Sequence, residues 1–400
     1  MTKAYVVGTF DTKGAELRYI QDLIEATGVA TCLVDLGTGS GESGMVDVTA
    51  AEVASHHPDG VGAVLGGTDR GRAVTAMAEA FARFVPSRTD IGGMIGAGGS
   101  GNTALIASGM GALPLGVPKI LVSTVASGDV SPYVGPNDIA MVYSVADIAG
   151  LNPITRTILG NAAHALTGMV RQIVPQVNEE KPAIGLTMFG VTTNCVDQVR
   201  ALIGTEYECL VFHATGTGGQ SMEKLAENGF VRGCIDVTTT EVCDHLMGGV
   251  FSAGDARFDA LAMAGLPYVG SCGALDMVNF GAKETIPDKY RDRNIYIHNP
   301  QVSLMRTTAD ENRAIGEWIG AKLNMFTGPV RFLIPENGVS LIDAPDMPFH
   351  DPEADIALFE ALEATVIVSE NRQILRCPYH INDPQFAAAI VAAWRDITEG

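Results

Sequence analysis

Short apolar runs alternate along the chain with longer segments in which apolar residues recur every three or four positions. In the first such pair, Ala4–Val7 is continuously apolar and is followed at helical spacing by Leu17, Ile20, Leu23 and Ile24. A continuous apolar run bounded by glycine is typical of a strand covered on both faces, and the spacing behind it is typical of a helix. The pattern therefore predicts β–α units built around parallel sheets.

The same alternation continues to the end of the chain. In the first half, the runs expected to form further strands are Thr31–Leu36, Val61–Leu65, Ile91–Ile95 and Lys119–Val122. In the second half, they are Ile184–Phe189, Cys209–His213, Gly233–Val237, Tyr268–Ser271, Ile295–His298, Val330–Ile334 and Thr365–Val368. The polar stretch Val174–Pro182 marks a domain boundary between the halves. A final helix, Asp383–Thr398, could belong to either half.

We therefore predict an α/β fold of two Rossmann-like, doubly wound domains with mostly parallel sheets. The first domain is expected to span residues 1–178 and the second residues 179–400, facing each other across a cleft. In such sheets ligands bind beyond the carboxyl ends of the strands, so the residues that follow each strand are the candidates for a site.

Composition narrows the range of partners. The formal net charge of −20 repels a nucleic-acid backbone, so no nucleic-acid partner is expected. The seven cysteines are scattered and never form a C-x-x-C pair, which argues against a disulfide framework and a zinc ribbon. No apolar run reaches membrane-spanning length and no apolar leader opens the chain, so we expect a cytoplasmic protein without a membrane partner.

Two glycine-rich turns stand directly behind predicted strands. Gly8–Gly14 follows Ala4–Val7, and Gly96–Gly101 follows Ile91–Ile95. A helical pattern comes after each turn, so backbone N–H groups and the positive end of a helix dipole would point at one spot, where an anion is favoured. The pair of turns predicts a nucleotide site.

Neither turn matches a standard nucleotide motif in full. Gly96–Gly101 has the G-x-G-x-x-G spacing, but it follows a late strand and has no acidic residue about twenty positions further on. In the first turn Lys13 precedes Gly14, which is the wrong order for a P-loop. Glycine turns that serve helix–strand packing alone are the alternative, but several turns converging on one edge favour a ligand.

The strand-end residues of the first half offer hydroxyls, glycines, a lysine and carboxylates. Asp11 is the expected contact for Mg²⁺ on the nucleotide, and Asp69 is a second carboxylate that could hold the ion. The glycine-rich loop Gly37–Gly44 could be mobile at the mouth of the site or a plain surface linker. The candidate nucleotide-binding residues are Thr9, Asp11, Thr12, Lys13, Gly98, Gly99, Ser100, Gly101, Asn102, Thr103, Ser123, Thr124, Ser127 and Gly128.

In the second half, three strand ends rich in threonine and glycine could hold an anion or simply cap helices: Gly190–Asn194, Ala214–Gly219 and Val237–Glu241. Titratable side chains accompany them, with Asp276 and Glu336 among these. We take His213 as the candidate base and Arg306 as the candidate anion contact, although a lone histidine is more often structural. The candidate catalytic residues are His213, Glu241, Arg306, His298 and His380.

Metal and nucleophile chemistry have weaker support in the second half. The candidate histidines and glutamates lie far apart and show no H-E-x-x-H spacing, so no zinc site is predicted. Cys195, near a predicted helix start, and Cys272, after a predicted strand, are alternative nucleophiles, with buried inert thiols as the simpler interpretation.

Several strings of residues resemble one known family, that of the tomato protein that inhibits tobamovirus RNA replication. The similarity covers nearly the whole chain, in the strings 8–13, 98–101, 118–128, 187–193, 212–216, 236–242, 273–281, 301–308 and 378–383. The resemblance implies an ATP-binding chain of two α/β subdomains that forms a homodimer, with the nucleotide in the first subdomain. The candidate nucleotide residues of the turns 9–13 and 98–101 and of the segment 123–128 match the family. Phe10 departs from the tomato protein, which has a small residue there.

Three functions follow as hypotheses. In the first, ATP or another nucleoside triphosphate binds with Mg²⁺ to the first domain, and a small anionic metabolite in the second cleft undergoes ATP-dependent transfer or ligation. In the second, the protein is a nucleotide-responsive protein-binding module without turnover. In the third, His213 and Glu241 do acid–base chemistry on a carboxylate metabolite without consuming ATP. The sequence leaves the enzyme question, the substrate and the choice between adenine and guanine open.

Overall fold

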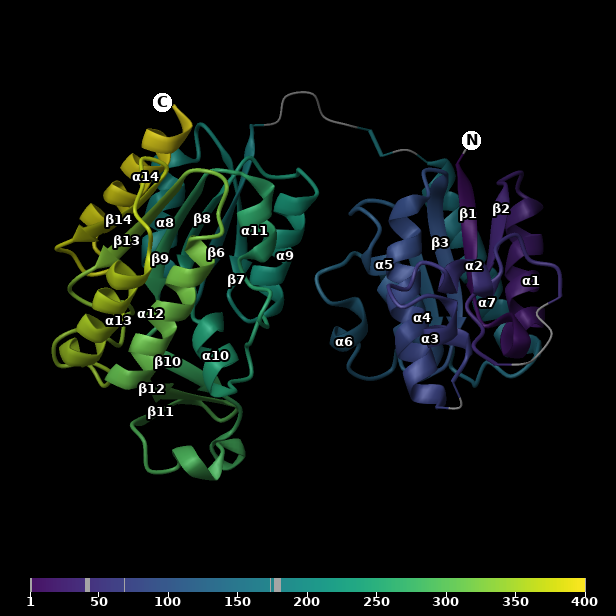
Figure 1. The fold of residues 1–400 in the computed structure, drawn as a ribbon, viewed down its shortest axis with the longest axis horizontal. Helices are drawn as coiled ribbons and strands as arrows, with labels where there is room; N and C mark the ends of the chain where they lie inside the picture. The colour runs from purple at the N-terminus through teal and green to yellow at the C-terminus, as the bar shows by residue number, and fades with distance from the viewer. Residues whose placement is uncertain (1, 40–43, 68, 173, 176–180, 400) are drawn as a thin grey trace. The chain divides into compact units, whose positions relative to one another are not determined.

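The structure is a computed structural model that describes residues 2–39, 44–67, 69–172, 174–175 and 181–399. Its contacts divide the chain into two compact units, Met1–Gln176 and Val177–Gly400 (Figure 1). Each unit is a parallel sheet with helices on both faces, which confirms the α/β, Rossmann-like fold. No helix among the described residues is long and apolar enough to span a membrane.

The first unit contains a five-stranded parallel sheet in the order β2-β1-β3-β4-β5. Its strands are β1 (Lys3–Gly8), β2 (Thr31–Asp35), β3 (Ile91–Gly98), β4 (Lys119–Ser123) and β5 (Ala140–Tyr143). The chain leaves β1 toward one edge for β2 and returns on the other side as β3. This reversal creates a switch point between β1 and β3, where ligands of doubly wound folds bind.

Helices cover both faces of this sheet. They are α1 (Phe10–Glu25), α2 (Ala50–Ala54), α3 (Val61–Leu65), α4 (Arg70–Phe84), α5 (Ser100–Gly111), α6 (Ser131–Val134) and α7 (Pro153–Arg171), with the 3₁₀ turn η1 (Val85–Ser87). Successive side chains of β1 point to opposite faces, so Ala4 and Val6 pack against α1 and α7, whereas Tyr5 and Val7 pack against α4 and α5. Both faces of the strand are buried, which explains its unbroken apolar pattern.

The second unit has a six-stranded parallel sheet in the order β14-β13-β9-β8-β6-β7, with a switch point between β6 and β8. Its strands are β6 (Ala183–Met188), β7 (Glu208–His213), β8 (Cys234–Thr238), β9 (Tyr268–Gly273), β13 (Val330–Pro335) and β14 (Arg372–Cys377). A separate antiparallel sheet in the order β10-β12-β11 contains β10 (Met277–Phe280), β11 (Ile295–Asn299) and β12 (Val302–Arg306).

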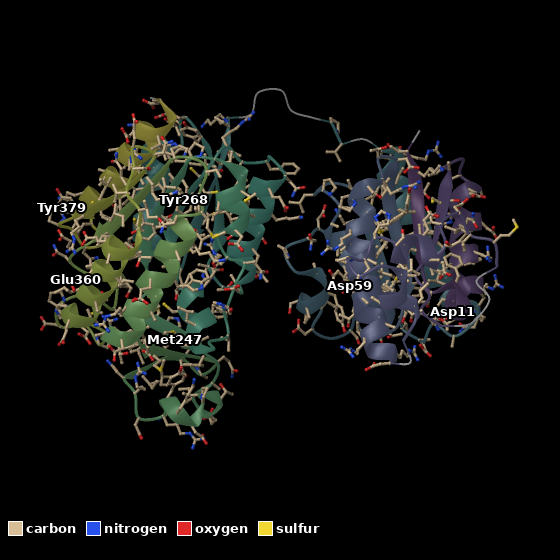
Figure 2. All side chains as sticks on the ribbon, viewed as in Figure 1. Asp11, Asp59, Met247, Tyr268, Glu360 and Tyr379 are labelled. Atoms are coloured by element: carbon tan, nitrogen blue, oxygen red, sulfur yellow. The ribbon has the colours of Figure 1, made fainter. Side chains whose placement is uncertain are left out.

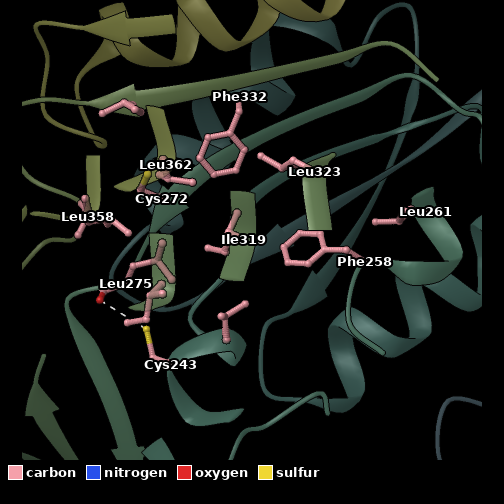
Figure 3. Packing of buried hydrophobic residues seen from close by; sticks show 14 of the residues in the cluster. Cys243, Phe258, Leu261, Cys272, Leu275, Ile319, Leu323, Phe332, Leu358 and Leu362 are labelled. Atoms are coloured by element: carbon pink, nitrogen blue, oxygen red, sulfur yellow. Dashed lines mark hydrogen bonds between the residues drawn. The ribbon is translucent and has the colours of Figure 1, made fainter. Parts of the chain in front are cut away.

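The helices of this unit are α8 (Thr193–Ile203), α9 (Thr217–Glu227), α10 (Glu241–Met247), α11 (Asp259–Ala264), α12 (Ala309–Leu323), α13 (Pro352–Thr365) and α14 (Pro384–Thr398), with the 3₁₀ turns η2 (Lys283–Thr285) and η3 (Asp288–Tyr290). One core lies beneath α12 and α13, where Phe332 of β13 packs beside Leu323 and Leu362 (Figure 3). A second core joins α8 and α14 to the opposite face. The final helix α14 therefore belongs to the second unit.

Two expected strands are wrong. Val61–Leu65 forms α3, and among its residues only Val64 is buried, so this short apolar run does not enter the sheet. Thr365 ends α13, and Ile367 and Val368 are exposed by 68% and 63% in the loop that follows. The strand expected there is β14, a few residues later. The structure also adds β5, β10 and β12 to the expected strands and places β11 outside the parallel sheet.

Candidate functional site

A cavity of about 680 Å³ opens at the carboxyl-terminal edge of the first sheet, at the β1/β3 switch point. Both glycine turns line it. The first contributes Thr9, Asp11, Thr12 and Lys13, and the second contributes Gly99, Ser100, Gly101 and Asn102. Figure 2 shows Asp11 at this edge of the unit. The structure thus brings together the two turns that lie about ninety residues apart in the sequence.

Three helices begin at the cavity wall, namely α1, α4 and α5. Thr9, the N-cap residue of α1, makes no side-chain hydrogen bond to a backbone N–H group of the first turn, and Gly99, the N-cap residue of α5, has no side chain that could make one. Asp69, by contrast, caps α4 by accepting hydrogen bonds from the N–H groups of Gly71 and Arg72 at 2.9 and 3.2 Å. Two helix N-termini that are not capped by their own N-cap residues therefore face one cavity, which favours an anion there, although Asp35 accepts from the N–H of Phe10 at the start of α1.

Side-chain hydrogen bonds tie the two turns to each other. Asn102 Nδ2 donates to Thr9 Oγ1 at 2.9 Å, and the Thr9 and Thr12 hydroxyl oxygens lie 2.7 Å apart. Gly98 packs directly behind this contact, since a Cβ on Gly98 would lie 2.4 Å from Cβ of Asn102. Gly98 consequently permits the close approach of the turn, and the residues after it line the cavity.

In the part of the chain that the structure describes, four charged side chains line the cavity. Lys13 and Arg70 are the cations, and Asp11 and Asp147 are the carboxylates. The ammonium of Lys13 donates a hydrogen bond to the backbone carbonyl of Ile148. In a chain whose net charge is −20, Lys13 and Arg70 bring cations to the wall, and their charge balances that of the two carboxylates beside the helix N-termini.

Asp11 has an incomplete set of partners. Its Oδ1 atom is buried and no hydrogen bond reaches it within the described part of the chain. Gly37 and Gly39 pack against its carboxylate, where a Cβ on Gly39 would lie 2.7 Å from Oδ2. The neighbouring Asp35 instead accepts from the N–H groups of Phe10 and Gly37 at 3.0 and 2.8 Å. Asp35 therefore orders the two loops, and among the described residues Asp11 keeps an acceptor without a donor.

Some of the expected nucleotide residues lie away from the cavity wall. Thr103 and Ser123 are buried and share a hydrogen bond of 2.6 Å between their hydroxyl oxygens, so they join α5 to β4. Thr124, Ser127 and Gly128 follow β4 and are absent from the lining of this cavity. Asp69 is occupied as the cap of α4. These residues support the wall or lie beyond it.

Other lining residues were not among the candidates, namely Thr38, Gly39, Gly67, Arg70, Ala73, Val74, Leu105 and Asp147. Thr38 and Gly39 belong to the loop expected near the mouth, whose residues 40–43 lie outside the described residues, as does Thr68. Asp147 follows β5, a strand that the pattern did not predict. Ala73, Val74 and Leu105 are apolar helix residues that carry no signal of a site in the sequence.

In the second unit, Glu241 lies in a buried ion-pair network. It is fully buried, accepts from the N–H groups of Gly216 and Gly219 at 2.7 and 3.0 Å, and pairs with Arg257 at 2.9 Å. Burial raises the pKa of Glu241 and Arg257 acts against this rise. The buried carboxylate thereby holds the β7–α9 turn in place through its two backbone N–H groups. His213, at the end of β7, is exposed, and partial desolvation lowers its pKa.

The other three candidates lie in different surroundings. Arg306 is buried and hydrogen-bonds Asp355 Oδ1 and Phe349 O, both at 2.7 Å. His380 Nε2 lies 2.9 Å from Ser340 O, and its Nδ1 accepts from a backbone N–H. His298 is exposed on β11. The structure therefore does not bring the five candidate catalytic residues together in one pocket.

Two further expectations concern thiols and metals. Both thiols are buried, and burial raises the pKa of Cys195 to about 12 and also raises the pKa of Cys272, which disfavours the thiolate form that a nucleophile needs. Among the described residues, no three His, Cys, Asp or Glu side chains are grouped so as to hold a metal ion. Glu336 is exposed and pairs with Arg376 at 3.3 Å.

A smaller cavity of about 360 Å³ lies in the second unit beside Arg306. Its wall includes Arg293, Thr307 and His350. Arg293 is already paired with Glu311 through two hydrogen bonds of 2.9 and 2.7 Å. Both arginines of this cavity therefore have carboxylate partners.

Comparison with known proteins agrees with this division. Residues 2–175 match the N-terminal domain of the uncharacterised protein family UPF0261, and residues 181–398 match its C-terminal domain. A UPF0261 protein of Rhizobium meliloti strain 1021 is 58% identical over 397 residues, covering 99% of both chains, and one of Clostridium tetani is 45% identical over 392 residues, covering 97% of both.

The tomato resemblance is also confirmed. The ToMV resistance protein Tm-1(GCR237) of Solanum lycopersicum is 41% identical over 420 residues, which cover 99% of this chain and 56% of the tomato protein. The ToMV susceptible protein tm-1(GCR26) is 40% identical over the same length. With both domains matched along nearly its whole length, the chain belongs to the UPF0261 family.

Proposed function

We propose that the first unit binds a nucleoside triphosphate, with ATP as the first candidate, in the cavity at the β1/β3 switch point. One observation carries the proposal: α1 and α5 both begin at the same cavity wall, beside Lys13 and Arg70, and neither is capped by the side chain of its own N-cap residue. Backbone N–H groups at two helix N-termini and two cations suit a ligand with several negative charges. The volume of about 680 Å³ lies within the ordinary range for small-molecule and cofactor sites.

Mg²⁺ is part of the proposal, with Asp11 as its contact. A magnesium ion on a nucleotide is commonly held by one or two carboxylates together with phosphate oxygens and waters, so a single acidic side chain is sufficient. The buried Oδ1 of Asp11, which lacks a hydrogen-bond donor among the described residues, fits this role. When bound, the ion would neutralise phosphate charge beside the two turns.

Whether the protein consumes ATP or only responds to it depends on a further ligand site in the second unit. Transfer or ligation needs a site for the small anionic metabolite, for which the cavity beside Arg306 is the candidate. The acid–base alternative has less support, because Glu241 is fully buried and paired with Arg257. A module without turnover stays open, and a protein partner would then read the nucleotide state. Steady consumption of ATP in the presence of a metabolite mixture would exclude the module.

Gly99→Val tests the nucleotide site. Gly99 has an ordinary φ of −85°, and a Cβ there would meet only Thr124 Oγ1 at 3.7 Å, so the fold is expected to tolerate the side chain. The valine methyls would occupy the space of a bound phosphate. We expect binding of Mg·ATP, measured by isothermal titration calorimetry, to fall below detection.

A matched glycine controls this test. Gly190 stands in a strand-to-helix turn of the second unit, and a Cβ there would meet no atom within 4 Å. Gly190→Val is expected to bind Mg·ATP with the affinity of the unchanged protein. Retained affinity in Gly99→Val would refute the site.

Homodimer formation and a cytoplasmic location complete the proposal. Analytical ultracentrifugation tests the first and cell fractionation tests the second.

A further inference from the structure

The loop between β5 and α7 contains a strained residue. Val145 has a φ of +63°, in the left-handed region where a β-branched side chain crowds the backbone. Its side chain is 60% exposed, so burial does not hold the turn in place. Strained backbone persists only where surrounding contacts over-determine it, and it concentrates at ligand clamps and switch regions.

Two contacts from α1 hold the later part of this loop, while at its start the N–H of Ser144 donates to Ser123 O of β4 at 3.2 Å and the Ser144 hydroxyl donates to Ala146 O at 2.7 Å. Lys13 Nζ donates to the carbonyl of Ile148, and Glu16 Oε1 accepts from the N–H of Gly150 at 2.6 Å. Ile148 is itself buried in the core between the sheet and α1. Asp147, just before it, lines the proposed nucleotide cavity. The loop is therefore held by the same helix turn that forms one wall of that cavity.

Lys13 contacts the 144–150 loop and also lines the proposed nucleotide cavity. It lines the cavity, and it is also the residue at which α1 departs from helical geometry, with φ −126° and ψ 15°. A phosphate oxygen carries charge, so it is a stronger acceptor for an ammonium than the neutral carbonyl of Ile148. A triphosphate in the cavity would thus compete with the loop for Lys13.

We propose that a bound nucleoside triphosphate draws Lys13 away from Ile148 and lets the turn at Val145 relax, so that nucleotide binding changes the conformation of residues 144–150. This inference rests on the proposed function and adds a regulated segment to it. Coupling between binding and conformation is reciprocal. The strain at Val145 must therefore raise the affinity for the nucleotide, because binding releases it.

Val145→Gly and Val145→Asn test the coupling. Glycine and asparagine adopt the left-handed region more readily than valine, so both variants stabilise the conformation in which Lys13 contacts Ile148. We expect a higher thermal midpoint without nucleotide and, by calorimetry, a dissociation constant for Mg·ATP about tenfold higher, equivalent to about 1.4 kcal/mol. A purely structural turn would raise the midpoint and leave the dissociation constant unchanged, and that result would overturn the inference.

A second strained residue serves as the matched control. Asp346 has a φ of +70° in an exposed loop of the second unit. Asp346→Gly relieves strain there and is expected to leave the affinity for Mg·ATP unchanged. A loss of affinity equal to that of Val145→Gly would mean that the effect is not specific to the 144–150 loop.

Hydrogen exchange reports on the loop directly. The N–H of Ala146 donates to Ser144 O at 2.7 Å across Val145, and the N–H of Gly150 is bound to Glu16. We expect Mg·ATP to accelerate exchange at both amides. If the unchanged protein binds no Mg·ATP, the proposed function fails. If it binds while exchange and the Val145→Gly affinity stay the same, the nucleotide site stands and the coupling fails.

Discussion

At the residue scale, Arg257 holds three carboxylates in the interior of the second unit. Its guanidinium lies 2.8 Å from Glu223 Oε1, 2.8 Å from Asp236 Oδ2 and 2.9 Å from Glu241 Oε2, and all four side chains are buried. Charges in a low-dielectric interior are tolerated only when they are paired and hydrogen-bonded. Removing this guanidinium would leave three buried acidic groups without the cation that pairs with them, and only their hydrogen bonds to neutral groups would remain.

Arg257→Met is therefore expected to lower the free energy of unfolding by about 3–5 kcal/mol. Urea unfolding followed by tryptophan fluorescence measures this, because the two tryptophans, Trp318 and Trp394, both lie in the second unit. Arg291→Met is the control, since Arg291 pairs with Asp288 where both side chains are exposed, by 65% and 85%. Its change should stay below about 1 kcal/mol, and a comparably small change in Arg257→Met would contradict the network's importance.

Individual residues also show what the sequence could reveal. Thr9, Lys13 and Asn102 could be predicted as neighbours because each follows a strand that is apolar on both faces. Glu241 stood out by the same rule, but its partner Arg257 lies in a loop without any periodic signal. The sequence alone does not distinguish a strand-end carboxylate that binds a ligand from one that neutralises a buried arginine. The three-dimensional position of the arginine is needed to tell them apart.

At the element scale, α4 and α5 pack so closely that Gly109 leaves no room for a side chain. A Cβ on Gly109 would lie 2.1 Å from Cε1 of Phe81, whose ring is buried in the core of the first unit. Both helices begin at the cavity, so their packing also sets the distance between Arg70 and the second glycine turn.

Gly109→Ala should therefore destabilise the first unit, by about 1–3 kcal/mol, even though alanine is the better helix former. Gly168→Ala is expected to change the stability of the first unit in the opposite direction, because Gly168 is exposed on α7 and a Cβ there meets no atom within 4 Å. That variant is expected to gain up to about 1 kcal/mol. Differential scanning calorimetry compares the two, and equal shifts in the same direction would refute the packing argument.

Elements at the edges of a sheet were the hardest to predict. β1, β3 and β4 are central strands, buried on both faces, and their apolar runs are visible in the sequence. β14 is an edge strand, mostly half-buried, and its residues Arg372–Cys377 include two arginines and a glutamine. The more apolar segment Thr365–Val368 was predicted as the strand in place of β14, although it lies at the end of α13.

At the scale of the whole molecule, two buried carboxyl groups make the stability of the second unit depend on pH. Burial, followed by the charge of Asp343, raises the pKa of Asp276 to about 7 and that of Asp355 to about 8, and Arg306 opposes both shifts. In the unfolded chain such carboxyls release their protons near pH ~3.9. The folded unit therefore binds more protons than the unfolded chain between these limits, so its stability falls as the pH rises toward 8.

The urea midpoint of the tryptophan-monitored transition is accordingly expected to be higher at pH 5.5 than at pH 8.5. Asp276→Asn keeps the size of the side chain and removes one ionisation, so its midpoint should depend less on pH across the same interval. A midpoint of the unchanged protein that rises from pH 5.5 to pH 8.5 would show that these carboxyls are ionised in the folded unit.

Among the described residues, each parallel sheet contains strands from one half of the chain alone: β1 to β5 form the first, and β6 to β9 with β13 and β14 form the second. During translation, every strand of the first sheet is therefore synthesised before β6. The amino-terminal half can fold while the rest is still being made, as domains of larger chains generally do. Newly made chains would then expose only one immature sheet at a time to chaperones and proteases.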